Sequence, residues 1–310
     1  MQKRIGGITP VMLTPFDDAG AVDFDSLERL VEWYVERGAD TLFAVCQSSE
    51  MQYLSLSERV EISSFVAARA GGRIPVIASG HVSDDPQDQA RELEMMAGTG
   101  ADALVLVTNR LDLKNEGSEA FRSALEALLA HLPAEMPLGL YECPAPYRRL
   151  LSDDELKFCR DTGRFVVFKD VSCDLDTVKR RVALCEGSPL AVVNANAAIA
   201  REAMRAGSEG FAGVFTNFHP DLYAWIYRNR LSDSPLMRDL TVFLALAAMA
   251  EPMGYPALAK FYHTRLGTLR TMKCRTIDFD IRERFWALEP LLDHIMEGTE
   301  IFRQRIAEET

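Results

Sequence analysis

The run Phe165-Val166-Val167-Phe168-Lys169-Asp170 predicts a buried strand that ends in a lysine. Four apolar residues in a row, two of them valine, are typical of a strand that is covered on both faces, as in a parallel sheet. A lysine at the end of such a strand either extends to water or lies in a pocket that lowers its pKa. In the second case its amine could act as a Schiff-base nucleophile.

Seven further apolar runs of strand length occur in the chain, and helical patterns alternate with them. The eight predicted strands cover residues 8–13, 41–45, 75–78, 103–107, 138–141, 165–168, 190–193 and 210–215. Eight strand–helix alternations at a spacing of about 30 residues predict a parallel sheet. Closure into a (β/α)8 TIM barrel fits the length of 310 residues better than an open sheet, which usually has fewer repeats.

After residue 220 the strand pattern ends, and only helical patterns follow, at 222–230, 236–250, 257–266 and 285–296. We therefore expect an α/β catalytic barrel over 1–220 and a C-terminal helical region over 221–310. The run from Leu240 to Ala250 is apolar nearly all round, so we expect it to be buried, with another subunit as one possible cover.

The composition excludes several classes of partner. A net charge of −12 and a pI of about 5.0 make nucleic acid and anionic membranes poor partners. The six cysteines are scattered without a C-x-x-C motif, which favours reduced thiols over disulfides or a metal site. No signal peptide or bilayer-spanning run is predicted. We expect a cytoplasmic protein.

The active site of such a barrel lies at the carboxyl ends of its strands. Tyr141 and Lys169 end adjacent predicted strands, so their side chains should face one cavity, where a phenol can move protons for an amine. The turn Gln47-Ser48-Ser49 offers hydroxyl and N–H groups that suit a carboxylate. An imine beside a carboxylate describes a 2-oxo acid. Polar residues at other strand ends are Thr14, Ser79, His81, Thr108, Asn109, Arg110, Glu142, Asp170, Asn194, Asn196, Thr216 and Asn217.

These residues resemble the dihydrodipicolinate synthase / N-acetylneuraminate lyase family of Schiff-base aldolases. The resemblance covers essentially the whole chain, and Tyr141 and Lys169 have the separation that the family requires. The matching motifs are Thr14-Pro15-Phe16 with Asp23-Phe24-Asp25, Gly72 to Ala78, Gly100-Ala101-Asp102-Ala103, Tyr141-x-x-Pro144, Lys169-Asp170 and Asn217-x-x-Pro220.

The resemblance implies a lyase in which Lys169 forms the imine with a 2-oxo acid and Tyr141 relays protons. It implies that Gln47, Ser48 and Ser49 hold the substrate carboxylate, and that Ala212 offers a backbone carbonyl near the tyrosine. The family's glutamate is Glu50 here, which we interpret as structural. No metal and no organic cofactor is expected, and the family implies a homo-oligomer, either a dimer or a tetramer.

The chain also departs from the family pattern. The turn Cys46-Gln47-Ser48-Ser49-Glu50 lacks both glycines of the usual Gly-Thr-Thr-Gly-Glu, which could re-aim the carboxylate site. Asn109 and Arg110 replace paired tyrosines after the fourth strand. The arginine that binds the second substrate of dihydrodipicolinate synthases is Pro146 here. We therefore expect a divergent member and not an authentic dihydrodipicolinate synthase.

Other interpretations stay open at this point. Arg110, Arg148 or Arg149 could bind an anionic group or a sugar-acid hydroxyl, and Arg110 could equally form an ion pair. Lys169 could be a rim lysine paired with a carboxylate. The chain could be a catalytically silent relative that binds a 2-oxo acid or sugar acid. An unrelated phosphate-binding barrel is disfavoured, because no glycine-rich loop follows the seventh or eighth strand. Cleavage, condensation and dehydration are equally compatible with an imine.

Overall fold

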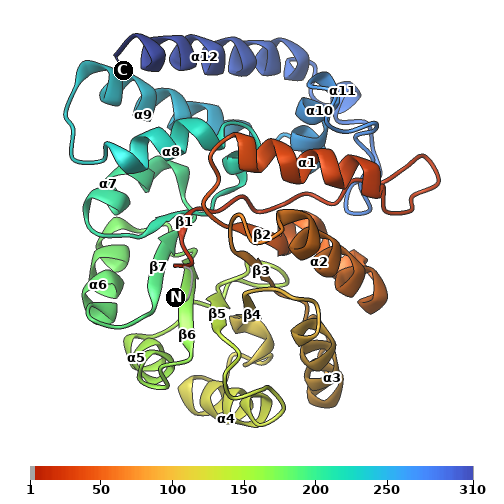
Figure 1. Ribbon diagram of the computed structural model, residues 1–310, viewed down its shortest axis with the longest axis vertical. Helices are drawn as coiled ribbons and strands as arrows, with labels where there is room; N and C mark the ends of the chain where they lie inside the picture. The colour runs from red at the N-terminus through yellow and green to blue at the C-terminus, as the bar shows by residue number, and fades with distance from the viewer. Residues whose placement is uncertain (1–3, 310) are drawn as a thin grey trace.

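Eight short parallel strands form one sheet in the computed structural model, which describes residues 4–309 (Figure 1). The strands are β1 (Gly7–Ile8), β2 (Leu42–Val45), β3 (Val76–Ala78), β4 (Ala103–Val107), β5 (Leu138–Tyr141), β6 (Phe165–Asp170), β7 (Ala191–Asn194) and β8 (Gly210–Phe211). Their order is β1-β8-β7-β6-β5-β4-β3-β2. The Phe43 N–H donates to the Pro10 carbonyl at 3.0 Å, and the Met12 N–H donates to the Phe43 carbonyl at 3.1 Å. These bonds join the segment after β1 to β2, so the predicted barrel is confirmed.

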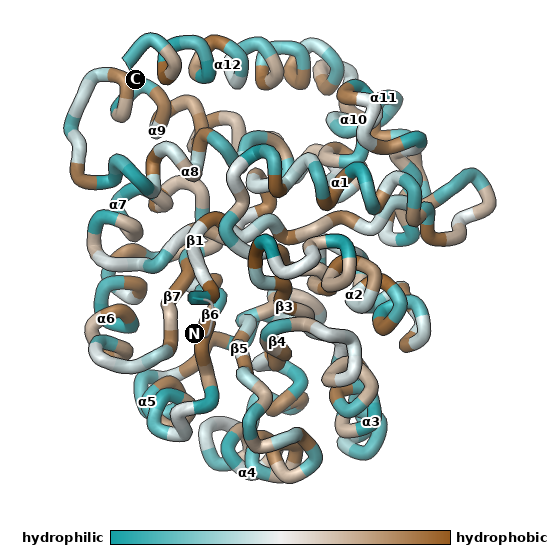
Figure 2. The backbone as a smooth tube through the Cα atoms, in the orientation of Figure 1, coloured by the Kyte–Doolittle hydropathy of each residue, from teal (hydrophilic) through white to brown (hydrophobic). Residues whose placement is uncertain are grey.

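The helices between the strands lie outside the barrel (Figure 1). They are α1 (Phe24–Glu36), α2 (Leu56–Ala70), α3 (Pro86–Ala97), α4 (Ser118–Leu129), α5 (Asp153–Asp161), α6 (Leu175–Cys185), α7 (Ala200–Arg205) and α8 (Pro220–Arg228). Ser55 and Ser152 each form a capping box with a glutamate three residues later, which fixes where α2 and α5 begin. Along the helices hydrophilic and hydrophobic residues alternate, as expected for helices that cover a sheet (Figure 2).

The strand residues are almost all buried, as their apolar sequences predict. Phe165 and Phe168 of β6 are fully buried, one toward each face of the sheet. In β5, a side chain at Gly139 would place its Cβ 2.8 Å from a methyl group of Val167. Close packing of β5 against β6 therefore depends on this glycine, and these two strands carry Tyr141 and Lys169.

The remaining helices are α9 (Pro235–Ala247), α10 (Ala257–Arg265), α11 (Ile281–Arg284) and α12 (Leu288–Glu309). They gather at one side of the barrel, where α12 crosses beside α8 and α9 (Figure 1). The helix predicted at 285–296 was placed too early and made too short, since α12 extends to residue 309. Because α8 packs on β1, it is the eighth helix of the barrel. The division of the chain at residue 220 stays a prediction.

The apolar run from Leu240 to Ala250, which extends from α9 into the following 3-10 turn, is only partly buried in a single chain, so its cover by another subunit stays a prediction. Leu240 and Leu244 are buried, whereas Val242, Leu246 and Met249 are 57%, 67% and 72% exposed. Within residues 4–309, no helix is both long enough and apolar enough to cross a bilayer.

Candidate active site

A cavity of about 1220 Å³ lies at the carboxyl ends of the barrel strands. Tyr141 and Lys169 line it from β5 and β6, and Arg110 and Ala212 line it from the segments after β4 and β8. Gln47 enters from the turn after β2. The cavity therefore lies where barrel enzymes place their active sites.

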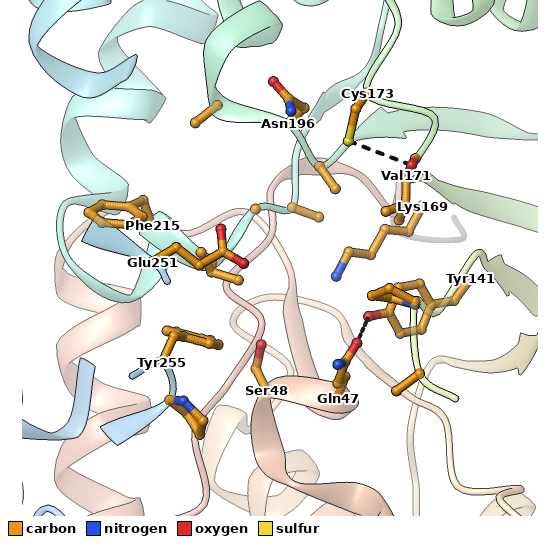
Figure 3. A pocket seen from close by; sticks show the side chains of 18 of the residues that line it. Gln47, Ser48, Tyr141, Lys169, Val171, Cys173, Asn196, Phe215, Glu251 and Tyr255 are labelled. Atoms are coloured by element: carbon orange, nitrogen blue, oxygen red, sulfur yellow. Dashed lines mark hydrogen bonds between the residues drawn. The ribbon is translucent and has the colours of Figure 1, made fainter. Parts of the chain in front are cut away.

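Lys169 and Tyr141 are direct neighbours in the sheet. They are paired in the parallel register of β5 and β6, and both side chains face the cavity (Figure 3). The Lys169 Nζ lies 4.3 Å from the centre of the Tyr141 ring and 5.7 Å from that of the Phe43 ring. Lys169 is only 8% exposed. Two aromatic rings thus replace most of the water around its amine.

Burial lowers the pKa of Lys169 from 10.5, while Cys46, Cys143 and Glu251 act in the opposite direction. Within residues 4–309, no carboxylate lies close enough to Lys169 to form an ion pair, and the neighbouring Asp170 pairs with Arg181 instead. The interpretation of Lys169 as an ion-paired rim lysine is therefore wrong. Its neutral form, which is the nucleophilic form of an amine, is favoured by these surroundings.

The Tyr141 hydroxyl donates a long hydrogen bond of 3.4 Å to the Gln47 side-chain oxygen (Figure 3). The Cys143 thiol approaches the same oxygen at 3.5 Å. Burial raises the pKa of Tyr141 well above 10.0, so the phenol holds its proton near neutral pH. Gln47 is therefore placed beside the candidate proton relay as well as beside the candidate carboxylate site.

The two serines of the predicted carboxylate turn have different surroundings. Gln47–Ser49 forms a single 3-10 turn, and Ser48 lines the cavity. The Ser49 hydroxyl is fully buried, donates to the Cys46 carbonyl at 2.8 Å and accepts from the Cys46 N–H at 2.6 Å. The structure brings Gln47 and Ser48 into the cavity, and Ser49 closes the turn behind them.

Of the three candidate arginines, Arg110 alone lines the cavity within the described chain. Its guanidinium donates to Asp84 at 2.5 Å and to the Val82 carbonyl at 3.0 Å. Arg149 is buried and pairs with Asp112 and Glu155, as its two ion pairs of 2.8 and 2.7 Å show.

The third arginine, Arg148, is exposed and donates to the Val171 carbonyl at 3.2 Å. His81 accepts from the Val107 N–H at 2.6 Å, and His219 contacts Thr299 at 3.2 Å. Both histidines are fully buried, and neither lines the cavity.

Two cavity residues, Glu251 and Tyr255, were missed because they follow α9, where the sequence shows only helical patterns. Figure 3 shows both side chains on the wall opposite Lys169. The Tyr255 hydroxyl accepts from the Asn217 amide at 3.0 Å. A charged residue at the end of the apolar run 240–250 was the one local signal that could have indicated Glu251.

Comparisons with known proteins agree with this geometry. The model of the Dihydrodipicolinate synthetase family matches residues 4–275. The 4-hydroxy-tetrahydrodipicolinate synthase of Bacillus subtilis is 27% identical over 181 residues, which span 58% of this chain and 61% of that protein. A dihydrodipicolinate synthase structure from Bacillus anthracis has a TM-score of 0.83 at 21% identity and covers 93% of this chain and 97% of its own.

A further solved structure, CdNal from Clostridium difficile in complex with mannosamine, has a TM-score of 0.83 at 15% identity and covers 95% of this chain and 99% of its own. These two likenesses show the fold, whereas the family model extends over most of the chain. The protein is thus a divergent member of the dihydrodipicolinate synthetase family of Schiff-base lyases.

Proposed function

We propose that the protein is a lyase that forms a Schiff base between Lys169 and the C2 carbonyl of a 2-oxo acid. The substrate is pyruvate-type or a 2-keto-3-deoxy sugar acid. The observation that carries this proposal is the buried Lys169 amine, which has no ion-pair partner within the described chain and lies 4.3 Å from the Tyr141 ring at the cavity wall. Such surroundings favour the neutral, nucleophilic amine.

In the proposed reaction, the Lys169 nitrogen attacks C2, and the Tyr141 phenol gives its proton to the oxygen on C2, which leaves as water. This step gives a protonated imine and a Tyr141 phenolate. In aldol cleavage, this phenolate accepts the proton of the C4 hydroxyl, and C4 becomes the carbonyl carbon of an aldehyde. The C3–C4 bond then breaks, and its electron pair forms the C2–C3 double bond of an enamine. Protonation at C3 and hydrolysis of the imine release pyruvate. Condensation is the reverse, and dehydration expels a hydroxyl instead of breaking the C3–C4 bond.

The other predicted residues take supporting roles in this proposal. Gln47 and Ser48 bind the substrate carboxylate from the turn after β2, and Ser49 keeps that turn in shape. Ala212 contributes a backbone carbonyl near Tyr141. Arg110 faces the cavity with its guanidinium engaged by Asp84 and the Val82 carbonyl, so it suits a substrate hydroxyl better than an anion.

Borohydride trapping tests the proposal. The protein is incubated with pyruvate and with a panel of 2-keto-3-deoxy sugar acids, reduced, and measured by intact mass and peptide mapping. We expect an adduct on Lys169 that is lost in Lys169→Ala and retained in Lys157→Ala, an exposed lysine on α5. If no compound labels the protein while one raises its melting temperature, a catalytically silent binding protein is the better description.

The proposal also concerns the assembly. We propose a cytoplasmic homo-oligomer, a dimer or a tetramer, with a barrel domain over 1–220 and a helical region over 221–310. The exposed apolar side of α9, formed by Val242 and Leu246, supports contact with a second copy. Light scattering at several protein concentrations measures the size of the assembly, and a monomer at all concentrations would contradict this part.

A further inference from the structure

Only four carboxylate, ammonium or guanidinium side chains line the cavity among residues 4–309. They are Asp84, Arg110, Lys169 and Glu251. Arg110 pairs with the exposed Asp84 at 2.5 Å and also donates to the Val82 carbonyl and the Asn109 side-chain oxygen, so its guanidinium is already engaged by the protein. When Lys169 forms the protonated imine, the carboxylate of the substrate itself matches its positive charge, and Glu251 is the remaining charge that has no protein partner of opposite sign. The cavity therefore offers no free cation to a second anionic group of a substrate.

Glu251 directly follows the 3-10 turn Ala248–Ala250, and its N–H donates to the Ala248 carbonyl at 3.1 Å. Its carboxylate forms no hydrogen bond and no ion pair with the described part of the chain. Figure 3 shows this carboxylate and the Lys169 amine entering the same space from opposite walls. Glu251 is exposed at the open side of the cavity, and the atoms packed around it raise its pKa, which Lys169 lowers in turn. The carboxylate thus acts across the space that a bound substrate would fill.

The wall around Glu251 carries neutral polar groups. Tyr255 and Ser48 present hydroxyls beside one another, and Asn196 presents an amide (Figure 3). The Asn196 side-chain oxygen accepts from the Ala198 N–H at 2.9 Å, so the amide nitrogen is left to donate. A carboxylate flanked by hydroxyl and amide groups binds hydroxyl groups through its oxygens and repels a carboxylate or phosphate.

We propose that Glu251 determines specificity by accepting hydrogen bonds from hydroxyl groups on the distal part of the 2-oxo acid, and by rejecting substrates whose distal end is anionic. This inference rests on the proposed Schiff-base function and names its substrate class. The substrate is a 2-oxo acid with one carboxylate, next to the carbonyl, and a neutral hydroxylated tail.

Three compounds of one carbon skeleton test this inference: 2-keto-3-deoxygluconate, its 6-phosphate and the analogue oxidised to a carboxylate at C6. For each, kcat/KM of pyruvate release is measured with wild type, Glu251→Gln and Glu251→Lys. We expect wild type to favour the neutral tail by about tenfold or more, since a charged acceptor contributes roughly that much to a hydrogen bond. Glu251→Gln should reduce this ratio, and Glu251→Lys should reverse it.

The ratio of kcat/KM between two compounds reports only the effect of the distal group, because any effect of Glu251 on the pKa of Lys169 applies to all three compounds alike. Glu126→Gln is the matched control, since it removes one exposed carboxylate on α4 outside the cavity. An unchanged ratio in Glu251→Gln and Glu251→Lys, or a wild-type preference for an anionic tail, would overturn the inference. If pyruvate is trapped on Lys169 while the preference is absent, only this inference fails. If neither pyruvate nor any of the three compounds is trapped, the proposed function fails as well.

Discussion

Arg181 of α6 donates two hydrogen bonds, of 2.7 and 3.1 Å, to Glu142, the residue directly after Tyr141. The same guanidinium pairs with Asp170, the residue directly after Lys169. All three side chains are buried on the helix side of the sheet. One arginine therefore joins the ends of the two strands that carry the proposed catalytic pair.

Replacing Arg181 with methionine should destabilise the fold by about 3–5 kcal/mol, because it leaves two carboxylates buried without their counter-charge. Chemical denaturation measures this loss. The matched control is Arg180→Met, which removes an exposed arginine that pairs with Asp153 at 3.0 Å. The account would be wrong if the two variants were equally stable. Adding Glu142→Gln and Asp170→Asn to Arg181→Met should recover part of the lost stability.

Tyr141→Phe should lower kcat by about 10²- to 10⁴-fold, which is the range for loss of a general acid–base group. The fold should be retained, because the lost hydroxyl makes only a 3.4 Å bond to Gln47. Steady-state kinetics and circular dichroism check both parts. Tyr227→Phe on α8, outside the cavity, is the control. Unchanged turnover in Tyr141→Phe would remove this residue from the proton relay.

The two serines of the turn should behave differently when each is replaced by alanine. Ser48→Ala should raise KM for the 2-oxo acid with little change in stability, because this hydroxyl faces the cavity. Ser49→Ala should cost about 1–3 kcal/mol in unfolding free energy, because it leaves the buried Cys46 N–H without its acceptor. Kinetics and denaturation on both variants test the contrast, and equal effects on KM would contradict it.

The rate of imine formation with pyruvate should rise with pH and level off below pH 10.5, the value of an ordinary lysine. Burial lowers the pKa of Lys169, so the neutral amine forms at lower pH than it does in free lysine. Glu251 raises the pKa of Lys169, and therefore Glu251→Gln should move the midpoint to still lower pH. Borohydride trapping that is quenched at set times, at a series of pH values, gives the rate of imine formation as a function of pH. A midpoint at or above pH 10.5 would contradict the conclusion that burial lowers the pKa of Lys169.

The barrel and the pair Tyr141 and Lys169 could be predicted from the sequence because both depend on local patterns. A continuous apolar run marks β6, and Lys169 interrupts it where the strand reaches the cavity. The end strands were less predictable. Runs at 8–13 and 210–215 indicated longer strands than Gly7–Ile8 and Gly210–Phe211. Pro10 has no N–H to donate to a ladder, and the segment after Phe211 turns into a 3-10 helix at Val214.

The site residues that the sequence did not reveal depend on packing between distant segments. Ser48 and Ser49 are adjacent and chemically identical, and only the direction of each side chain in the turn separates a cavity residue from a buried one. Glu251 reaches the cavity because the region after α8 folds back over the barrel mouth. No periodicity within that region encodes where it will lie relative to Lys169.

The buried ion pair between Glu50 and Lys260 links the proposed carboxylate turn to α10 across 2.6 Å, and Glu50 also accepts from the N–H groups of Arg275 and Thr276. The turn that carries Gln47 and Ser48 is thus anchored by residues more than 200 positions away. A chimera that joined this barrel to the helical region of a relative would keep this anchor only if that region carried a lysine in the place of Lys260. The shape of the carboxylate turn therefore depends on the helical region as well as on the barrel.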